Sequence, residues 1–89
     1  MAKRLNKLDR MTSEEKVAES LRFWEAGNDA LFPPETIAIV LGMSLAWLQA
    51  KRCNGGGISF IKPNGNKIIY YQKSDVISFI KRNKLANTA

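Results

Sequence analysis

The sequence predicts a small α+β domain that is mostly helical and contains one two-stranded β-hairpin. Three observations lead to this fold class. Apolar residues recur at helical spacing in several separate stretches. Asn64-Gly65, a strong hairpin-turn signal, separates two β-prone segments, residues 58–62 and 67–71. The chain has 89 residues, which is enough for one domain with a small core.

The N-terminal part of the chain predicts a basic, flexible arm over residues 1–12 and an additional helix within residues 13–28. Thr12 or Ser13 can cap this helix, and Gly27-Asn28 can end it. Val17, Leu21 and Trp24 repeat at helical spacing and form an apolar stripe. The helix therefore packs on the rest of the domain, or it forms a dimer or binds a partner.

The next stretch predicts two short helices joined by a tight turn. Pro33-Pro34 suits the first turn of the first helix, which extends to Leu41. Gly42 allows the positive φ of the turn, and Ser44 can cap the second helix, which extends to Arg52. Two helices in this arrangement make a helix-turn-helix.

The remaining stretch predicts a hairpin followed by a last helix. Residues 53–57 contain three consecutive glycines, so we expect them to be non-helical. A two-stranded hairpin is not stable alone, so it must lie against the helices as a wing. The last helix begins at Ser74-Asp75 and carries an apolar stripe, Val76, Phe79 and Ile80. We therefore expect a winged helix-turn-helix domain over residues 31–84 and a tail over residues 85–89.

Several short motifs occur in a characteristic order. They are Leu41-Gly42-Met43-Ser44, Lys51-Arg52, Gly55-Gly56-Gly57, Phe60-Ile61-Lys62, Tyr70 or Tyr71, and Ser74-Asp75-Val76. Together they resemble the excisionase/MerR-like winged helix-turn-helix family of small prophage and mobile-element regulators. The resemblance implies a double-stranded DNA-binding protein, either a transcriptional regulator or an excisionase-type architectural factor. Its recognition helix would enter the major groove. The helix within residues 13–28 lies outside the pattern.

The charge distribution favours a polyanionic partner. The net charge is +6, from 14 Lys and Arg against 8 Asp and Glu. Residues 13–36 hold six acids and two bases, a net −4, whereas residues 37–89 hold eight bases and one acid, a net +7. A basic surface of this kind is typical of nucleic-acid binding. The same bases would also keep a small domain soluble.

On this interpretation the DNA-contacting residues lie on the second helix of the pair and on the wing. They are Ser44, Ala46, Trp47, Gln49, Ala50, Lys51, Arg52, Lys62, Asn64 and Lys67. A glutamine can bond adenine, and an arginine can bond guanine or phosphate. Lys51 and Arg52 could instead form a solvated last turn that the helix dipole favours. The wing lysines could instead protect an exposed strand edge from pairing with another chain. The arm over residues 1–12 is either a minor-groove arm or a solvated end. Trp47 packs between elements, presses on DNA or anchors a protein interface.

The composition argues against an enzyme and against a metal site. The chain has no histidine and one cysteine, Cys53, so it lacks the commonest general base and the ligands of a structural zinc site. We expect no cofactor, no signal peptide, no membrane span, and a cytoplasmic, nucleoid-associated location. A domain this small needs a homodimer or cooperative adjacent copies to bind DNA specifically. The alternative function is a protein–protein adaptor that binds through Trp47 and the N-terminal helix.

Overall fold

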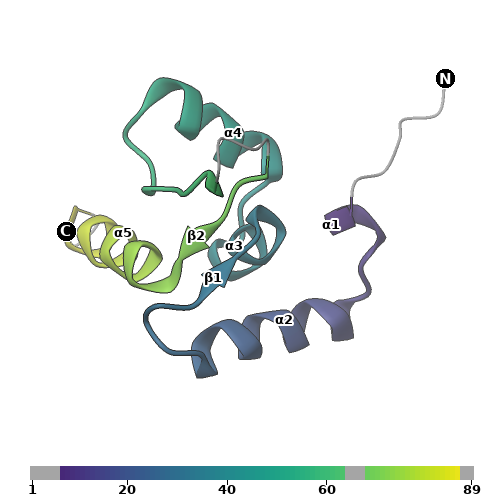
Figure 1. Cartoon of the computed structure of the whole chain (residues 1–89). Coiled ribbons are helices and arrows are strands. Elements are labelled where there is room, and N and C mark those ends of the chain that lie inside the picture. The colour runs from purple at the N-terminus through teal and green to yellow at the C-terminus, as the bar shows by residue number, and fades with distance from the viewer. Residues whose placement is uncertain (1–6, 64–67, 87–89) are drawn as a thin grey trace, which may run out of the picture.

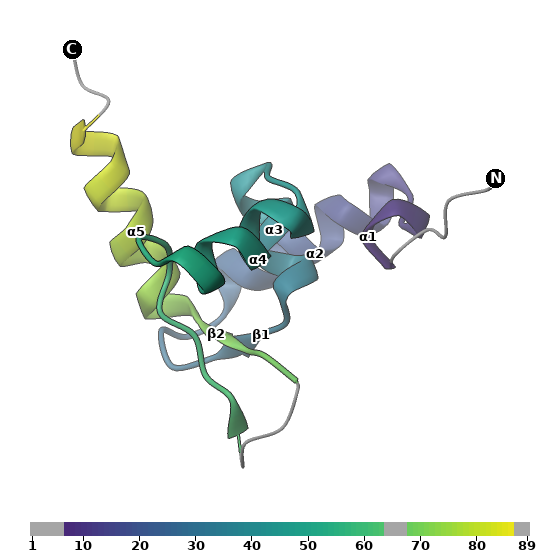
Figure 2. The same ribbon diagram turned by 90° about the horizontal axis from the view of Figure 1, so that it is seen from above.

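The computed structural model describes residues 7–63 and 68–86, which form an α+β fold of helices around a small antiparallel sheet (Figure 1). In chain order the elements are α1 (Lys7–Arg10), α2 (Ser13–Glu25), β1 (Leu31–Phe32), α3 (Pro34–Leu41), α4 (Leu45–Asn54), β2 (Tyr71–Gln72) and α5 (Lys73–Ala86). Helix α3 lies between α2 and α4 (Figure 1), and the three helices overlap when they are seen from above (Figure 2). The expected class, a mostly helical α+β protein with a two-stranded sheet, is confirmed.

The sheet is not the one that the sequence predicted. β1 pairs antiparallel with β2, which joins Leu31 to Gln72 and Phe32 to Tyr71. Residues 58–63 and 68–70, called the bridged loop below, are joined by a single bridge between Ile61 and Tyr70. The regular strands expected at 58–62 and 67–71 are therefore wrong for the described residues, because Tyr71 pairs with the distant Phe32 instead. Asn64 and Lys67 lie outside the described residues.

The helix signals near the N-terminus are confirmed, and a short helix that was not predicted precedes the expected one. Thr12 and Glu15 form a reciprocal capping box on α2, with N–H···O distances of 2.9 and 3.1 Å. Hydrogen bonds from Thr12 stabilise the Glu15 carboxylate and so lower the pKa of Glu15. The bond from the Thr12 backbone N–H has the larger effect and the bond with the Thr12 side chain the smaller one. Helix α1 occupies Lys7–Arg10, where the sequence predicted a flexible arm.

The predicted turn between two short helices is present between α3 and α4. Gly42 adopts the left-handed conformation with φ of 69°. The Ser44 hydroxyl accepts a hydrogen bond of 3.0 Å from the Trp47 N–H and so caps α4. α4 continues through Cys53 and Asn54, so the expectation that these two residues are non-helical is wrong. The helix persists because the glycines begin only at Gly55, whose N–H still bonds the Lys51 carbonyl at 2.9 Å.

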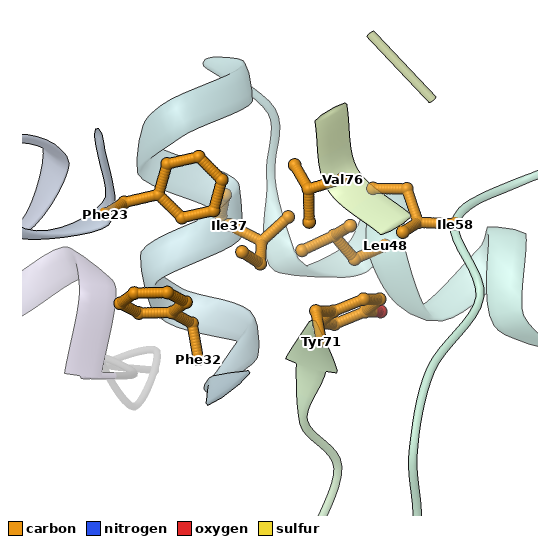
Figure 3. Packing of buried hydrophobic residues seen from close by; sticks show 8 residues of the cluster. Phe23, Phe32, Ile37, Leu48, Ile58, Tyr71 and Val76 are labelled. Carbon is orange, nitrogen blue, oxygen red and sulfur yellow. The ribbon is translucent and has the colours of Figure 1, made fainter. Parts of the chain in front are cut away.

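Elements throughout the fold contribute to one hydrophobic core (Figure 3). Its members are Phe23, Phe32, Ile37, Ala38, Leu48, Ile58, Tyr71 and Val76. Leu48 and Val76, both at expected apolar positions, are buried. Helix α2 enters the core through Phe23, whereas its predicted stripe of Val17, Leu21 and Trp24 stays exposed. α2 thus packs on the domain by a different face from the one its periodicity indicated.

Lys73, the first residue of α5, is buried and joins α5 to the end of α2. Its Nζ donates hydrogen bonds to the carbonyls of Trp24 at 2.8 Å and Ala26 at 2.7 Å. The ammonium also lies 5.6 Å from the centre of the Phe23 ring. These carbonyls belong to the C-terminal end of α2, where the helix dipole favours a cation. The side chain therefore acts as a C-terminal cap supplied by another helix.

We expect Lys73→Met to lower the free energy of unfolding by about 2 kcal/mol. Methionine keeps an unbranched apolar stem, but it leaves two carbonyls without their charged donor, and such hydrogen bonds contribute about 1.5–3 kcal/mol. Urea unfolding followed by tryptophan fluorescence measures the change. Lys81→Met on the exposed side of the same helix is the control and should leave the midpoint nearly unchanged. Equal midpoints for the two variants would contradict the capping role.

Candidate nucleic-acid interface

The outward face of α4 is made of small, uncharged side chains. Ala46, Gln49, Ala50 and Cys53 are all exposed, and their spacing of three and four residues places them on one helix face. Ser44, at the start of the helix, is exposed as well. Leu48 points the opposite way and is 1% exposed. The helix backbone on this side is therefore open to close approach by a large partner.

A groove of about 260 Å³ runs between α4 and the bridged loop. It is lined by Gln49, Arg52, Cys53, Phe60, Lys62 and Ile69. The fold thus brings together three of the residues predicted to contact DNA, Gln49, Arg52 and Lys62. The other three were not predicted. Cys53 follows Gln49 by four residues and so lies on the same helix face. It was missed because the expected helix ends at Arg52, whereas α4 extends to Asn54.

Arg52 is held in place by the core. Its Nη1 donates a 2.7 Å hydrogen bond to the hydroxyl of Tyr71, a side chain that is 1% exposed. A guanidinium has five N–H donors, so this bond leaves most of them available to a ligand. Arg52 is half-buried and lines the groove, which differs from the alternative of a freely solvated last turn. The Tyr71 contact could not be foreseen, because the two residues are 19 apart in sequence.

We expect a double-mutant cycle to show coupling between Arg52 and Tyr71. Tyr71→Phe keeps the buried ring and removes the hydroxyl, so it should cost about 1 kcal/mol of unfolding free energy. Arg52→Ala should cost a similar amount, and the double variant less than the sum, with an interaction of about 0.5–1 kcal/mol. Chemical denaturation of the four proteins measures these terms. Strict additivity would show that the hydrogen bond contributes no stability.

Trp47 and Lys51 lie on the other side of α4, toward α5. The Trp47 ring packs edge-on against Phe79, with 6.0 Å between ring centres. Lys51 Nζ lies 5.7 Å from the centre of the Trp47 ring. Of the three interpretations of Trp47, packing between elements is the one observed. Neither residue is among those that line the groove.

The glycine-rich segment after α4 needs a glycine at one position for close approach. A Cβ placed on Gly57 would lie 2.6 Å from the Lys51 Cβ, well inside van der Waals contact. The chain can therefore return along α4 only without a side chain there. This return brings Ile58 into the core and leads into the bridged loop, one wall of the groove.

Neither a metal-ligand cluster nor a membrane-spanning helix is found among the described residues. Within residues 7–63 and 68–86 no group of three or more His, Cys, Asp or Glu side chains is placed to hold a metal ion. Over those same residues no helix has the length and apolar character needed to cross a bilayer. Cys53 is a free, exposed thiol.

Comparison with known proteins found no matching family model, no matching curated protein and no matching solved structure.

Proposed function

We propose that the protein binds double-stranded DNA as a winged helix-turn-helix protein, with α4 in the major groove and the bridged loop as a wing on the adjacent backbone. One observation carries the proposal. The groove between α4 and the bridged loop joins an amide, a guanidinium and an ammonium, those of Gln49, Arg52 and Lys62, beside the small exposed face of α4. This combination suits a helix that approaches base edges while neighbouring cations bind phosphates.

Each of these side chains has a chemical role on DNA. The Gln49 amide can donate to and accept from adenine in the major groove. Arg52 can bond guanine or a phosphate in a fixed direction, since Tyr71 orients it. Lys62 is exposed and can neutralise a backbone phosphate. Ala46 and Ala50 leave room for thymine methyl groups.

The distribution of charge supports the same orientation. The basic excess falls in residues 37–89, a net +7 from eight bases and one acid, whereas α2 carries four of the acids. α2 lies on the far side of α3 from α4 (Figure 1), so its carboxylates are kept away from the proposed DNA face. We propose a role as a small regulator or architectural factor of a prophage or mobile element. It would act as a homodimer or as cooperative adjacent copies, since one domain presents a small interface.

The proposal is tested by fluorescence anisotropy of the full chain on duplex DNA from the region upstream of its own gene, across a salt series. A shuffled duplex of the same composition is the control. We expect tighter binding to the upstream duplex, with a preference that persists as salt rises. Equal and steeply salt-dependent binding to both duplexes would overturn sequence-specific binding, because it would reflect charge alone. No binding to either would overturn the DNA proposal altogether.

A further inference from the structure

Helix α2 exposes an apolar stripe that the fold does not cover. Val17, Leu21 and Trp24 are 59%, 55% and 48% exposed, and they follow one another along one face of the helix. Val17 and Lys16 line a mostly apolar groove of about 410 Å³ that continues toward Leu8, Ile39 and Met43. Single exposed apolar residues are ordinary, but a continuous patch that includes a tryptophan is typical of an interaction surface.

The stripe is held rigidly by contacts beneath it. Phe23 anchors α2 in the core, and the Trp24 ring packs edge-on against the Phe23 ring, with 5.0 Å between ring centres. The Trp24 carbonyl is bonded by the buried Lys73 ammonium at 2.8 Å. A tryptophan that is fixed in place before binding costs little conformational entropy when it is covered. Trp24 is therefore suited to anchor a partner.

Acidic side chains flank the stripe. Glu14 and Glu25 are exposed and lie on the same side of it, near its two ends. The other two acids of α2 are engaged within the fold. Glu15 belongs to the capping box, and Glu19 bonds Arg22 at 2.8 Å and the Thr36 hydroxyl at 2.9 Å.

We propose that α2 is a docking surface for a basic amphipathic helix of a protein partner. Such a helix would place apolar side chains on Val17, Leu21 and Trp24, and lysines or arginines opposite Glu14 and Glu25. The acids argue against a nucleic-acid strand on this surface. They also argue against an antiparallel second copy of α2, because antiparallel pairing through the stripe would bring Glu14 of one copy near Glu25 of the other.

This surface is separate from the proposed DNA face. Figure 1 places α3 between α2 and α4, so a helix bound on α2 leaves the exposed side of α4 open. The inference therefore does not depend on DNA binding, and the protein could hold a partner while it occupies DNA.

The test uses the full chain and two labelled helical peptides that share the same apolar positions. One carries lysines beside its apolar face, and the other carries glutamates in their place. By fluorescence anisotropy we expect the lysine peptide to bind at least about tenfold more tightly. Leu21→Lys should weaken its binding by about tenfold or more, and Glu14→Lys with Glu25→Lys should shift the preference to the glutamate peptide. Ile68→Lys is the matched control, because Ile68 is 56% exposed and lies on the bridged loop.

Three results would overturn the inference. Equal affinity for the two peptides, or no binding of either peptide, would contradict a docking surface that selects a basic helix. Equal losses in the Leu21→Lys and Ile68→Lys variants would show that α2 is not the docking surface. Sedimentation velocity would identify a second copy as the occupant if the wild-type chain forms dimers that Leu21→Lys dissociates. Circular dichroism of each variant confirms that the helices are retained.

Discussion

Combining Arg52→Glu with Lys62→Glu is expected to lower affinity for duplex DNA by about a hundredfold. Each change removes a cation from the groove between α4 and the bridged loop and places an anion next to the phosphates. A loss of about 1.4 kcal/mol per site corresponds to a factor of ten for each. The slope of log affinity against log salt concentration should also become shallower, by the amount that corresponds to about two lost phosphate contacts. Fluorescence anisotropy across a salt series measures both quantities.

The matched control is the pair Arg22→Glu and Lys16→Glu on α2. It changes the net charge by the same amount, with the same residue types, on the side of α3 away from α4. Its affinity should fall severalfold at most and its salt dependence should change little, because long-range charge is screened within about 10 Å at 0.1 M salt. If both pairs weaken binding equally, the groove is not the DNA site. The variant with Arg52→Glu and Lys62→Glu should still fold. The carboxylate introduced at position 52 can accept a hydrogen bond from the Tyr71 hydroxyl.

Tyr71→Ala is expected to lower the free energy of unfolding strongly. Replacing a buried aromatic side chain with alanine costs about 3–5 kcal/mol, through lost burial and the cavity that remains. Tyr71 is 1% exposed and contributes to the core. It also pairs with Phe32 in the sheet and bonds Arg52. A domain of this length has a total stability of about 5–13 kcal/mol, so the substitution removes a large share of it.

Urea unfolding followed by circular dichroism measures this effect, and Tyr70→Ala provides the comparison. Tyr70 is the preceding residue and is half-buried, and its interaction with Ile61 runs through the backbone, which alanine preserves. We expect Tyr70→Ala to cost clearly less than Tyr71→Ala. Similar midpoints for the two variants would show that the ring of Tyr71 does not support the core as described.

Local signals in the sequence predicted the elements whose ends depend on nearby residues. Thr12 and Ser44 cap helices, and Gly42 adopts a left-handed turn conformation, because each requirement is satisfied within a few residues of chain. The same reasoning placed Gln49, Arg52 and Lys62 as candidate DNA contacts, and the fold brings them to one groove. Their role on DNA stays a prediction.

Contacts between residues that are far apart in the sequence could not be predicted from local signals. Each strand of the sheet has two residues, too few to show an alternating pattern, and two helices separate Phe32 from Tyr71 in the sequence. The hydrogen bond from Arg52 to Tyr71 has the same origin. Helical periodicity found an apolar stripe on α2 but could not indicate which face is covered. The buried residue of α2 is Phe23, which lies outside the stripe.

The buried ammonium of Lys73 also has a consequence for how the protein can be shortened. From the sequence, residues 31–84 look like a self-sufficient unit to which an N-terminal helix has been added. A fragment that begins at residue 31 would lack the carbonyls of Trp24 and Ala26 that Lys73 bonds, and the Phe23 ring beneath them. It would lose these hydrogen bonds, and the apolar surface that Phe23 covers would be exposed to water. Helix α2 therefore belongs to the folding unit, and a fragment that begins at residue 31 is expected to be less stable than the full chain.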